Sequence, residues 1–342
     1  MSDRLELARR WARRVLGEGD LDLEPASADA SFRRYFRVRF PGGTRILMDA
    51  PPAHEDSRPF VAVAKLLRAA GVNAPAVHAS DLAQGFLLLD DLGDRSYLAL
   101  LDASNADVLY DDAIETLLRM QRGVPAQRVP AYDDALVARE LALFGDWFLD
   151  RHLGIAVEGD AKRILDEACA WLGREFQRQP RVFVHRDYHS RNLMYVERDN
   201  PGVLDFQDAV AGPAVYDLVS LLRDVYVEWP AARVDEWADR YHARALAAGL
   251  PVARERAEFR RQLDLVGAQR HLKVAGIFCR LYHRDGKPGY LDDIPLTLRY
   301  LAAECAALEA LAPLGALLAT LDLPAGLAAA NARVRARRAN GR

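Results

Sequence analysis

The segment 182–208, VFVHRDYHSRNLMYVERDNPGVLDFQD, constrains the fold of this 342-residue chain more than any other. Three short apolar runs in it, VFV, LMYV and VL, alternate with polar residues. The sequence Asn200-Pro201-Gly202 stands between the second and third runs, and these are residues that tight turns favour. We therefore expect a strand and a polar loop, followed by two strands that a turn joins.

The polar residues at the ends of these runs indicate one kind of chemistry. Asp187 lies in the loop after the first run, Asn192 follows in the same loop, and Asp205 ends the returning strand. In phosphoryl transfer a carboxylate accepts the proton of the substrate hydroxyl, and oxygen ligands hold Mg²⁺ against the phosphates of ATP. The pattern therefore predicts Asp187 as the catalytic base and Asn192 and Asp205 as magnesium ligands.

Two histidines in the same segment allow a different interpretation. His185, Asp187 and His189 alternate along the sequence and could form a transition-metal site. No further His or Cys cluster lies near them in the sequence, so we favour phosphoryl transfer. His185 is then expected to hold the loop by packing or hydrogen bonding. Asp217, at the start of a later apolar helix, either caps that helix or anchors the catalytic loop, and we favour the anchor.

The order of the remaining elements predicts an α+β fold with two lobes. After a first helix, β-like runs and a single amphipathic helix at 57–70 continue to about residue 90, which is typical of a small antiparallel sheet. Helical periodicity then dominates, and the segment 182–206 interrupts it. Helices are expected at 106–122, 133–152, 159–178, 214–227, 234–248, 252–284 and 295–312. We place a nucleotide-covering lobe at 1–93, a catalytic and substrate-binding lobe at 94–325, and an Arg-rich tail, frayed or disordered, at 326–342.

Two segments of the small lobe are candidates for binding ATP. The segment 28–38 lies where a hairpin loop would cover the phosphates; its small residues let backbone N–H groups approach, and its arginines add positive charge. The segment 88–93, LLDDLG, ends the last small-lobe strand, and its backbone is expected to bind the adenine edge. The predicted ATP-binding residues are Ser31, Phe32, Arg33, Arg34, Asp90, Asp91 and Leu92.

Composition and charge argue against several classes of partner. The formal net charge of −3 offers no general attraction to nucleic acids or membranes. Three widely spaced cysteines show neither metal-ligand spacing nor a disulfide framework, and the charged N-terminus lacks the apolar core of a signal peptide. We therefore expect a cytoplasmic protein that binds small molecules, with no nucleic-acid, membrane or obligate protein partner.

Several motifs of the chain resemble a known family. HRDYHSRN, DFQD and GPAVYDLVSLLRD resemble the aminoglycoside phosphotransferase and choline kinase group, within the protein-kinase-like fold, over about residues 20–310. DASFRRYFRV, RILMDAPPAHEDSRPF and QRHLKVAGIF are similar to one branch, the bacterial anomeric sugar kinases of cell-wall recycling. The resemblance implies phosphorylation of N-acetylmuramate or N-acetylglucosamine at the C1 hydroxyl with ATP and Mg²⁺. It also implies the roles given above for Asp187, Asn192 and Asp205.

The chain departs from this family at one position of the small lobe. Met48 stands where the wider kinase fold carries a strand lysine that pairs the phosphates. Glu55 and Asp56 offer no clear partner for such a cation. Neutralisation of the phosphates must then come from Mg²⁺, from loop amides, or from Arg33 or Arg34.

The acceptor is the least constrained part of the interpretation. Arg191 and Asp208 flank the catalytic residues, and Arg280 with neighbouring basic residues on a long helix could meet a sugar carboxylate. For each of these the alternative is a surface charge or an internal ion pair. Two other functions stay open: a kinase for another small alcohol or amine, such as an aminoglycoside or choline, and a non-catalytic nucleotide-binding pseudokinase.

Overall fold

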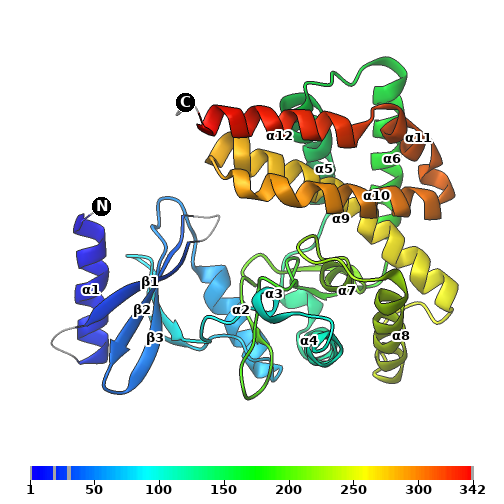
Figure 1. The fold of residues 1–342 in the computed structure, drawn as a ribbon. Helices are drawn as coiled ribbons and strands as arrows, with labels where there is room; N and C mark the ends of the chain where they lie inside the picture. Colours follow the sequence, from blue (N-terminus) through cyan, green and yellow to red (C-terminus); the bar gives the residue numbers. More distant parts are fainter. Residues whose placement is uncertain (1, 18–20, 29–31, 340–342) are drawn as a thin grey trace. The chain divides into compact units, whose positions relative to one another are not determined.

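The computed structural model describes residues 2–17, 21–28 and 32–339 (Figure 1). They form two compact units, one from Met1–Val129 with His185–Ala209 and one from Pro130–Val184 with Val210–Arg342. The chain leaves the second unit after residue 184 and returns to it at residue 210. The residues between, His185–Ala209, belong to the first unit; we call them the catalytic segment because they include the predicted base and metal ligands. The predicted boundaries at residues 93 and 325 do not appear in this division.

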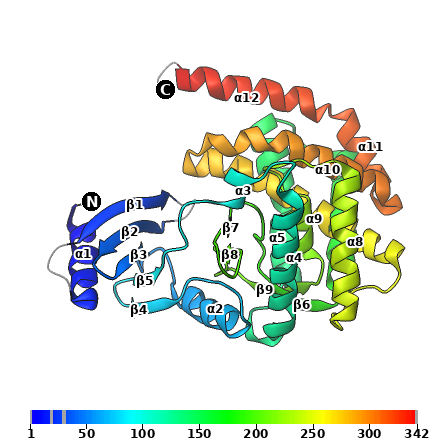
Figure 2. The same ribbon diagram turned by 60° about the horizontal axis from the view of Figure 1, so that its bottom comes forward.

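The first unit is built on an antiparallel five-stranded sheet in the order β1-β2-β3-β5-β4 (Figure 2). Its strands are β1 (Asp22–Ala28), β2 (Arg34–Phe40), β3 (Gly43–Asp49), β4 (Val77–Asp81) and β5 (Phe86–Asp90). Its helices are α1 (Ser2–Leu16), α2 (Arg58–Ala69), α3 (Tyr97–Leu100) and α4 (Ala106–Gly123), with a 3₁₀ turn η1 at Ala126–Arg128. The catalytic segment adds the hairpin of β7 (Leu193–Met194) and β8 (Gly202–Val203). A small antiparallel sheet with one helix between β3 and β4 is the predicted arrangement.

The two faces of this sheet have different neighbours. Side chains alternate between the faces along a strand, so the cross-strand partners Phe36 and Leu47 share one face. Both belong to a buried cluster with Trp11, so α1 covers this face with its apolar side. Tyr35 and Met48, which also pair across β2 and β3, therefore point to the opposite face. Met48 is fully buried there.

The second unit is mainly helical. Its helices are α5 (Asp134–Leu143), the π-helix η2 (Phe144–Leu153), α6 (Gly159–Gln177), α7 (Tyr216–Leu222), α8 (Ala231–Ala247), α9 (Arg256–Asp285), α10 (Ile294–Ala307), α11 (Ala312–Thr320) and α12 (Leu323–Ala339), with 3₁₀ turns η3 (Pro288–Asp293) and η4 (Glu309–Leu311). Two short strands, β6 (Arg181–Val184) and β9 (Val210–Pro213), pair antiparallel on either side of the catalytic segment in the sequence. The sheet of the first unit and these helices confirm the predicted α+β class.

Two helical segments differ from the prediction. The periodicity at 133–152 predicts one helix, but the α-helix ends at Leu143 and ten residues of π-helix follow. The segment predicted as a frayed or disordered tail forms most of α12, in which Leu327 and Val334 are buried. The side chain of Asn331 on α12 also lies 3.0 Å from Nε2 of His152. Because α12 buries one side against its own unit, it is part of the second unit and not a separate tail.

Length and hydropathy determine whether a helix can cross a membrane. In the part of the chain that the structure describes, no single helix is both long and apolar enough to cross a membrane. The segments Pro288–Ala307 and Glu309–Thr320 reach the required length and hydropathy only when they are taken together, and this pair is bent by 118°.

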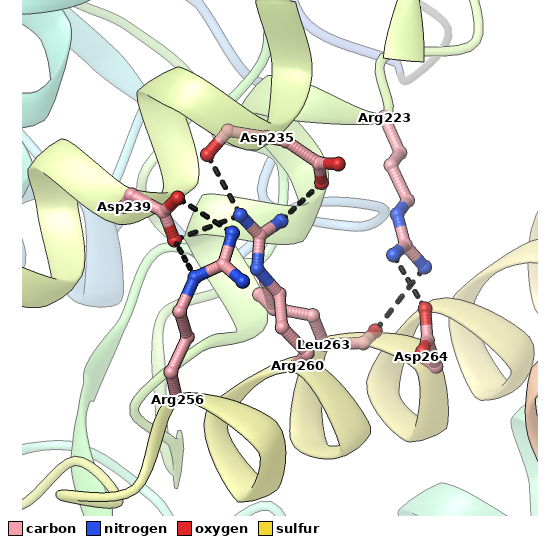
Figure 3. Close-up of polar contacts among 7 residues, drawn as sticks. All are labelled: Arg223, Asp235, Asp239, Arg256, Arg260, Leu263 and Asp264. Carbon is pink, nitrogen blue, oxygen red and sulfur yellow. Dashed lines mark hydrogen bonds and ion pairs between the residues drawn. The ribbon is translucent and has the colours of Figure 1, made fainter. Parts of the chain in front are cut away.

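Ion pairs fasten α8 to the first turns of α9 (Figure 3). Arg256 and Arg260 on α9 both donate to the carboxylate of Asp239 on α8, at 2.8 to 2.9 Å. Arg223, which follows α7, donates to Asp264 on α9 at 2.5 Å. The hydrogen bond from Arg256 lowers the pKa of Asp239, so this carboxylate stays ionised. These arginines therefore have structural partners inside the second unit.

Candidate active site

The loop that carries the predicted base follows β6, and its backbone is held on both sides of Asp187. The Asp187 amide donates to Nδ1 of His185 at 3.3 Å. Its carbonyl accepts hydrogen bonds from Asn192 Nδ2 at 2.9 Å and from the His189 amide at 3.1 Å. Arg186, just before it, has a φ of 80°, a left-handed conformation that non-glycine residues adopt rarely and often at functional sites. The half-buried carboxylate of Asp187 thus projects from a fixed backbone.

Side chains near the base attach the catalytic segment to α3 and α4. Tyr188 is buried, and its hydroxyl donates to the carbonyl of Ala113 on α4 at 2.8 Å. In the hairpin, Nδ2 of Asn200 donates to the Tyr97 hydroxyl at 2.7 Å and to the Asp112 carboxylate at 2.8 Å. Because these contacts fix the segment before substrate arrives, little conformational entropy is lost when substrate binds.

His185 holds the loop as a neutral imidazole. It is fully buried, and burial lowers its pKa to about 4. Its Nε2 donates to the carbonyl of Leu204 at 2.9 Å, while Nδ1 accepts from the Asp187 amide. Both ring nitrogens therefore have backbone partners, and the ring ties the loop to the strand that returns from the hairpin.

The depressed pKa of His185 predicts a loss of stability in acid. The unfolded chain binds a proton at this residue below about pH 6.5, whereas the folded protein does not until about pH 4. Because the unfolded state binds more protons between these values, the free energy of unfolding falls as the pH falls. From pH 7 to pH 5 this group should remove about 2 kcal/mol.

Urea unfolding of the wild type and of His185→Gln at both pH values checks this. Gln keeps a donor and an acceptor but does not titrate, so the variant should lose about 2 kcal/mol less than the wild type on acidification. An equal loss in both proteins would assign the acid sensitivity to other groups.

The hairpin β7–β8 places Asn192 beside Asp205. Leu193 pairs with Val203, and the Leu204 amide donates to the Asn192 carbonyl at 2.9 Å. As a result Nδ2 of Asn192 lies 3.4 Å from Oδ2 of Asp205. An amide oxygen and a carboxylate from adjacent side chains are hard donors, and Mg²⁺ favours one or two such protein ligands with waters and phosphate oxygens completing its shell. The donor set therefore fits Mg²⁺.

The residues after Asp205 support its position. Phe206 is buried and packs on Phe60 of α2 with ring centroids 4.8 Å apart. Gln207 was not singled out from the sequence, yet its Nε2 donates to Oδ1 of Asp205 at 2.7 Å and lies 3.4 Å from the Asp208 carboxylate. Gln207 thus orients the carboxylate whose other oxygen faces Asn192. Its place in the DFQD motif is the only sequence signal that marks it.

The transition-metal interpretation finds no support in the described residues. Within 2–17, 21–28 and 32–339, no group of three or more His, Cys, Asp or Glu side chains is placed to hold a metal ion. Nε2 of His185, which would have to bind such a metal, is engaged by the Leu204 carbonyl.

The loop predicted to cover the phosphates is described only in part, because Ser31 lies outside the described residues. Phe32 is 63% exposed, and its ring stacks on His54 with centroids 4.6 Å apart. Its amide donates to Oε1 of Glu55 at 3.2 Å. These contacts join the start of β2 to the segment between β3 and α2, and nucleotide binding by Phe32 stays a prediction.

The adjacent arginines have different partners. Arg33 donates through Nη2 to Glu55 at 3.0 Å, and its Nη1 lies 4.0 Å from Oδ1 of Asp205. Arg34 forms an ion pair with Asp49, which is fully buried on the sheet face covered by α1. From the sequence, Glu55 offers no clear partner for a phosphate-binding cation. In the structure Arg33 reaches Glu55 across a separation of 22 residues.

Side-chain contacts hold the connector that is predicted to bind adenine. The Asp91 carboxylate accepts hydrogen bonds from Arg37 on β2 at 2.6 and 3.0 Å. Burial alone would raise the pKa of Asp91, but the hydrogen bonds from Arg37 and the Gly93 amide outweigh it and lower the pKa. The Asp90 carboxylate accepts a backbone N–H at 2.9 Å. Both carboxylates have internal partners. Adenine binding by Asp90, Asp91 and Leu92 would therefore use their backbone groups, and it stays a prediction.

The residues predicted to bind the acceptor or to support the loop belong to different units. Arg191 and Asp208 are exposed in the first unit, where the Asp208 carbonyl accepts from Arg186 at 3.3 Å. Arg280, on α9, and Asp217, buried in the first turn of α7, belong to the second unit. Burial lowers the pKa of Arg280. The roles of these four residues stay predictions.

Comparisons with known proteins bear on both the fold and the family. A model of the phosphotransferase enzyme family matches residues 22–259. The N-acetylmuramate/N-acetylglucosamine kinase of Pseudomonas aeruginosa is 52% identical over 302 residues, and that of Pseudomonas putida is 49% identical over 300 residues; each match covers 88% of both chains. The crystal structure of a choline kinase from Streptococcus pneumoniae superposes with a TM-score of 0.61 at 10% identity, covering 87% of this chain and 98% of that one.

The solved structure shows that the fold is the protein-kinase-like one that the motifs implied. The family model extends from β1 into α9 and includes Asp187, Asn192 and Asp205. A match over more than half of the chain, together with relatives at about 50% identity, is sufficient to assign the family. This protein belongs to the phosphotransferase enzyme family.

Proposed function

We propose that this protein is an ATP- and Mg²⁺-dependent kinase that phosphorylates the anomeric C1 hydroxyl of N-acetylmuramate and N-acetylglucosamine. The observation that carries the proposal is the 52% identity, over 88% of both chains, to a kinase named for these two sugars. The reaction belongs to the recycling of peptidoglycan sugars in the cytoplasm, and the substrates are ATP and a small amino sugar.

In this proposal Asp187 is the general base. Its carboxylate accepts the proton of the C1 hydroxyl while the hydroxyl oxygen bonds to the γ-phosphorus and the bond to the β–γ bridging oxygen breaks, which releases ADP. The hydrogen bonds to its backbone from Asn192 and His189 hold the residue in place before substrate arrives. Asn192 and Asp205 would hold Mg²⁺, which neutralises charge on the phosphates when bound.

A non-catalytic nucleotide-binding protein is the alternative from another class. Such a protein needs to bind nucleotide but has no use for a base or for a complete set of metal ligands. Here Asp187, Asn192 and Asp205 are all present, and the carbonyl of the first and the carboxylate of the last both lie within 3.4 Å of the Asn192 amide nitrogen. Retention of the three residues in one cluster favours catalysis.

A phosphate-transfer screen tests the acceptor. Purified protein is incubated with MgATP and, separately, with N-acetylmuramate, N-acetylglucosamine, an aminoglycoside and choline. We expect transfer to the two sugars, and NMR should place the product phosphate on C1. Transfer only to the aminoglycoside or to choline would show that the protein is a kinase but that the proposed acceptor is wrong. If no compound is phosphorylated, the pseudokinase interpretation gains support.

A further inference from the structure

The strand position at which protein kinases carry a phosphate-binding lysine holds no cationic residue in this chain. In protein kinases a lysine on the third strand pairs the phosphates and is held by a helix glutamate. Here the corresponding strand residue is Met48, a buried apolar side chain that pairs across the sheet with Tyr35. Any cation that takes over the role of the lysine has to come from another position.

The ion-pair partners of Arg33 and Arg34 distinguish these two candidates. Arg34 is the cross-strand partner of Asp49, and its guanidinium is paired with that carboxylate on the face that α1 covers. Arg4 of α1 also pairs with Asp49, at 2.6 Å. Arg33 directly precedes β2, and its side chain instead contacts Glu55 and lies 4.0 Å from Asp205. Arg34 is therefore held by a buried carboxylate on the face that α1 covers, whereas Arg33 lies beside Asp205.

The contacts of Arg33 place it between two carboxylates. Glu55, which directly precedes the α2 region, accepts its hydrogen bond at 3.0 Å, and both side chains are little exposed, at 11% and 14%. The other terminal nitrogen lies 4.0 Å from Asp205, too far for a hydrogen bond but within reach of groups that bind beside that carboxylate. The same Glu55 carboxylate accepts the Phe32 amide, so it fixes both the loop and the guanidinium.

We propose that Arg33, held by Glu55, replaces the strand lysine and binds the terminal phosphates of ATP. Phosphate oxygens that share a cation with Asp205 would lie beside its carboxylate, and Nη1 of Arg33 lies 4.0 Å from Oδ1 of that carboxylate. A guanidinium binds phosphate through charge-assisted hydrogen bonds and stays charged at any physiological pH. Glu55 is the positioning residue of this pair. The inference rests on the proposed function only in taking ATP as the phosphate donor.

Nucleotide binding without an acceptor tests the proposal. Calorimetric titration compares ATP with AMP for the wild type, Arg33→Met and Arg33→Lys, with and without Mg²⁺. We expect Arg33→Met to bind ATP about 10- to 100-fold more weakly, since one charge-assisted contact is lost, and to bind AMP as the wild type does. Arg33→Lys keeps the charge and should recover part of the loss. Because no sugar is present, a wrong acceptor assignment leaves this result unchanged.

Two further variants separate the specific role from a general effect. Arg39→Met removes an exposed arginine of β2 that pairs at the surface with Glu24, and this variant should bind both nucleotides as the wild type does. Glu55→Gln should weaken ATP binding less than Arg33→Met, and the double variant should be no weaker than Arg33→Met alone. The proposal is overturned if Arg33→Met binds ATP normally, if ATP and AMP weaken equally, or if the wild type binds no ATP.

Discussion

Replacing Asp187 by Asn is expected to lower kcat for sugar phosphorylation by about 10²- to 10⁴-fold, because the carboxylate that accepts the hydroxyl proton is lost. Asn has nearly the same shape, and the backbone hydrogen bonds that hold this position involve the amide and carbonyl of residue 187, which the substitution keeps. Folding and ATP affinity should therefore stay close to those of the wild type. Initial rates at saturating MgATP and sugar measure the change in kcat.

Three measurements together decide the role of Asp187. The thermal unfolding midpoint and the affinity for ATP establish that the variant is folded and binds nucleotide. The pH dependence of kcat/KM should lose the acidic limb that reports the base. If Asp187→Asn keeps more than about one tenth of the wild-type kcat, the general-base role is wrong, because such a base contributes at least about 100-fold.

Replacing Asp205 by Asn should have an effect of similar size but of a different kind. The substitution removes the carboxylate charge from the proposed cation site, where Asn192 supplies only a neutral oxygen. Since a catalytic metal stabilises the phosphates by several kcal/mol, we expect kcat/KM for MgATP to fall by about 100-fold or more. The Mg²⁺ concentration needed for half-maximal rate should rise. Rates measured against free Mg²⁺ at constant ATP distinguish this from a loss of acceptor binding.

The hairpin offers a matched control for Asp205. Asp199 lies in the same hairpin and, like Asp205, has a left-handed φ, 53° against 64°. Asn tolerates this conformation, so Asp199→Asn makes the same chemical change with the same backbone demand but at an exposed position. It should leave the Mg²⁺ dependence unchanged. An unchanged Mg²⁺ requirement in Asp205→Asn would remove this residue from the metal site.

Local chemistry explains why the hairpin that carries the proposed site residues could be predicted from the sequence. The turn at 200–202 and the short apolar runs around it specify a hairpin, and the register of that hairpin pairs Leu193 with Val203. Once the hairpin closes, Asn192 and Asp205 must lie near each other. The helix ended by Gly71, which has a φ of 74°, is a second case in which a local signal was sufficient.

Elements that depend on distant partners were not predicted. Strand β9, with the sequence VAGP, carries little strand propensity, and it forms because β6 pairs with it along its whole length. The end of α5 and the start of the π-helix show no break in the apolar periodicity. The Arg-rich composition of α12 suggested a tail. In the structure Leu327 and Val334 are buried, so the helix packs against the rest of the second unit.

The sequence of 182–208 by itself determined the class of chemistry, since the proposed base, the proposed metal ligands and the turn all lie within one hairpin-sized segment. Only the tertiary structure decided which cation stands near Asp205. Arg33 and Arg34 are adjacent residues of the same type, but Arg34 begins β2 and pairs with the buried Asp49, whereas Arg33 precedes the strand and pairs with Glu55. The reason is that an ion pair between residues 22 apart depends on how the segments before β2 and before α2 are brought together, which no local pattern encodes.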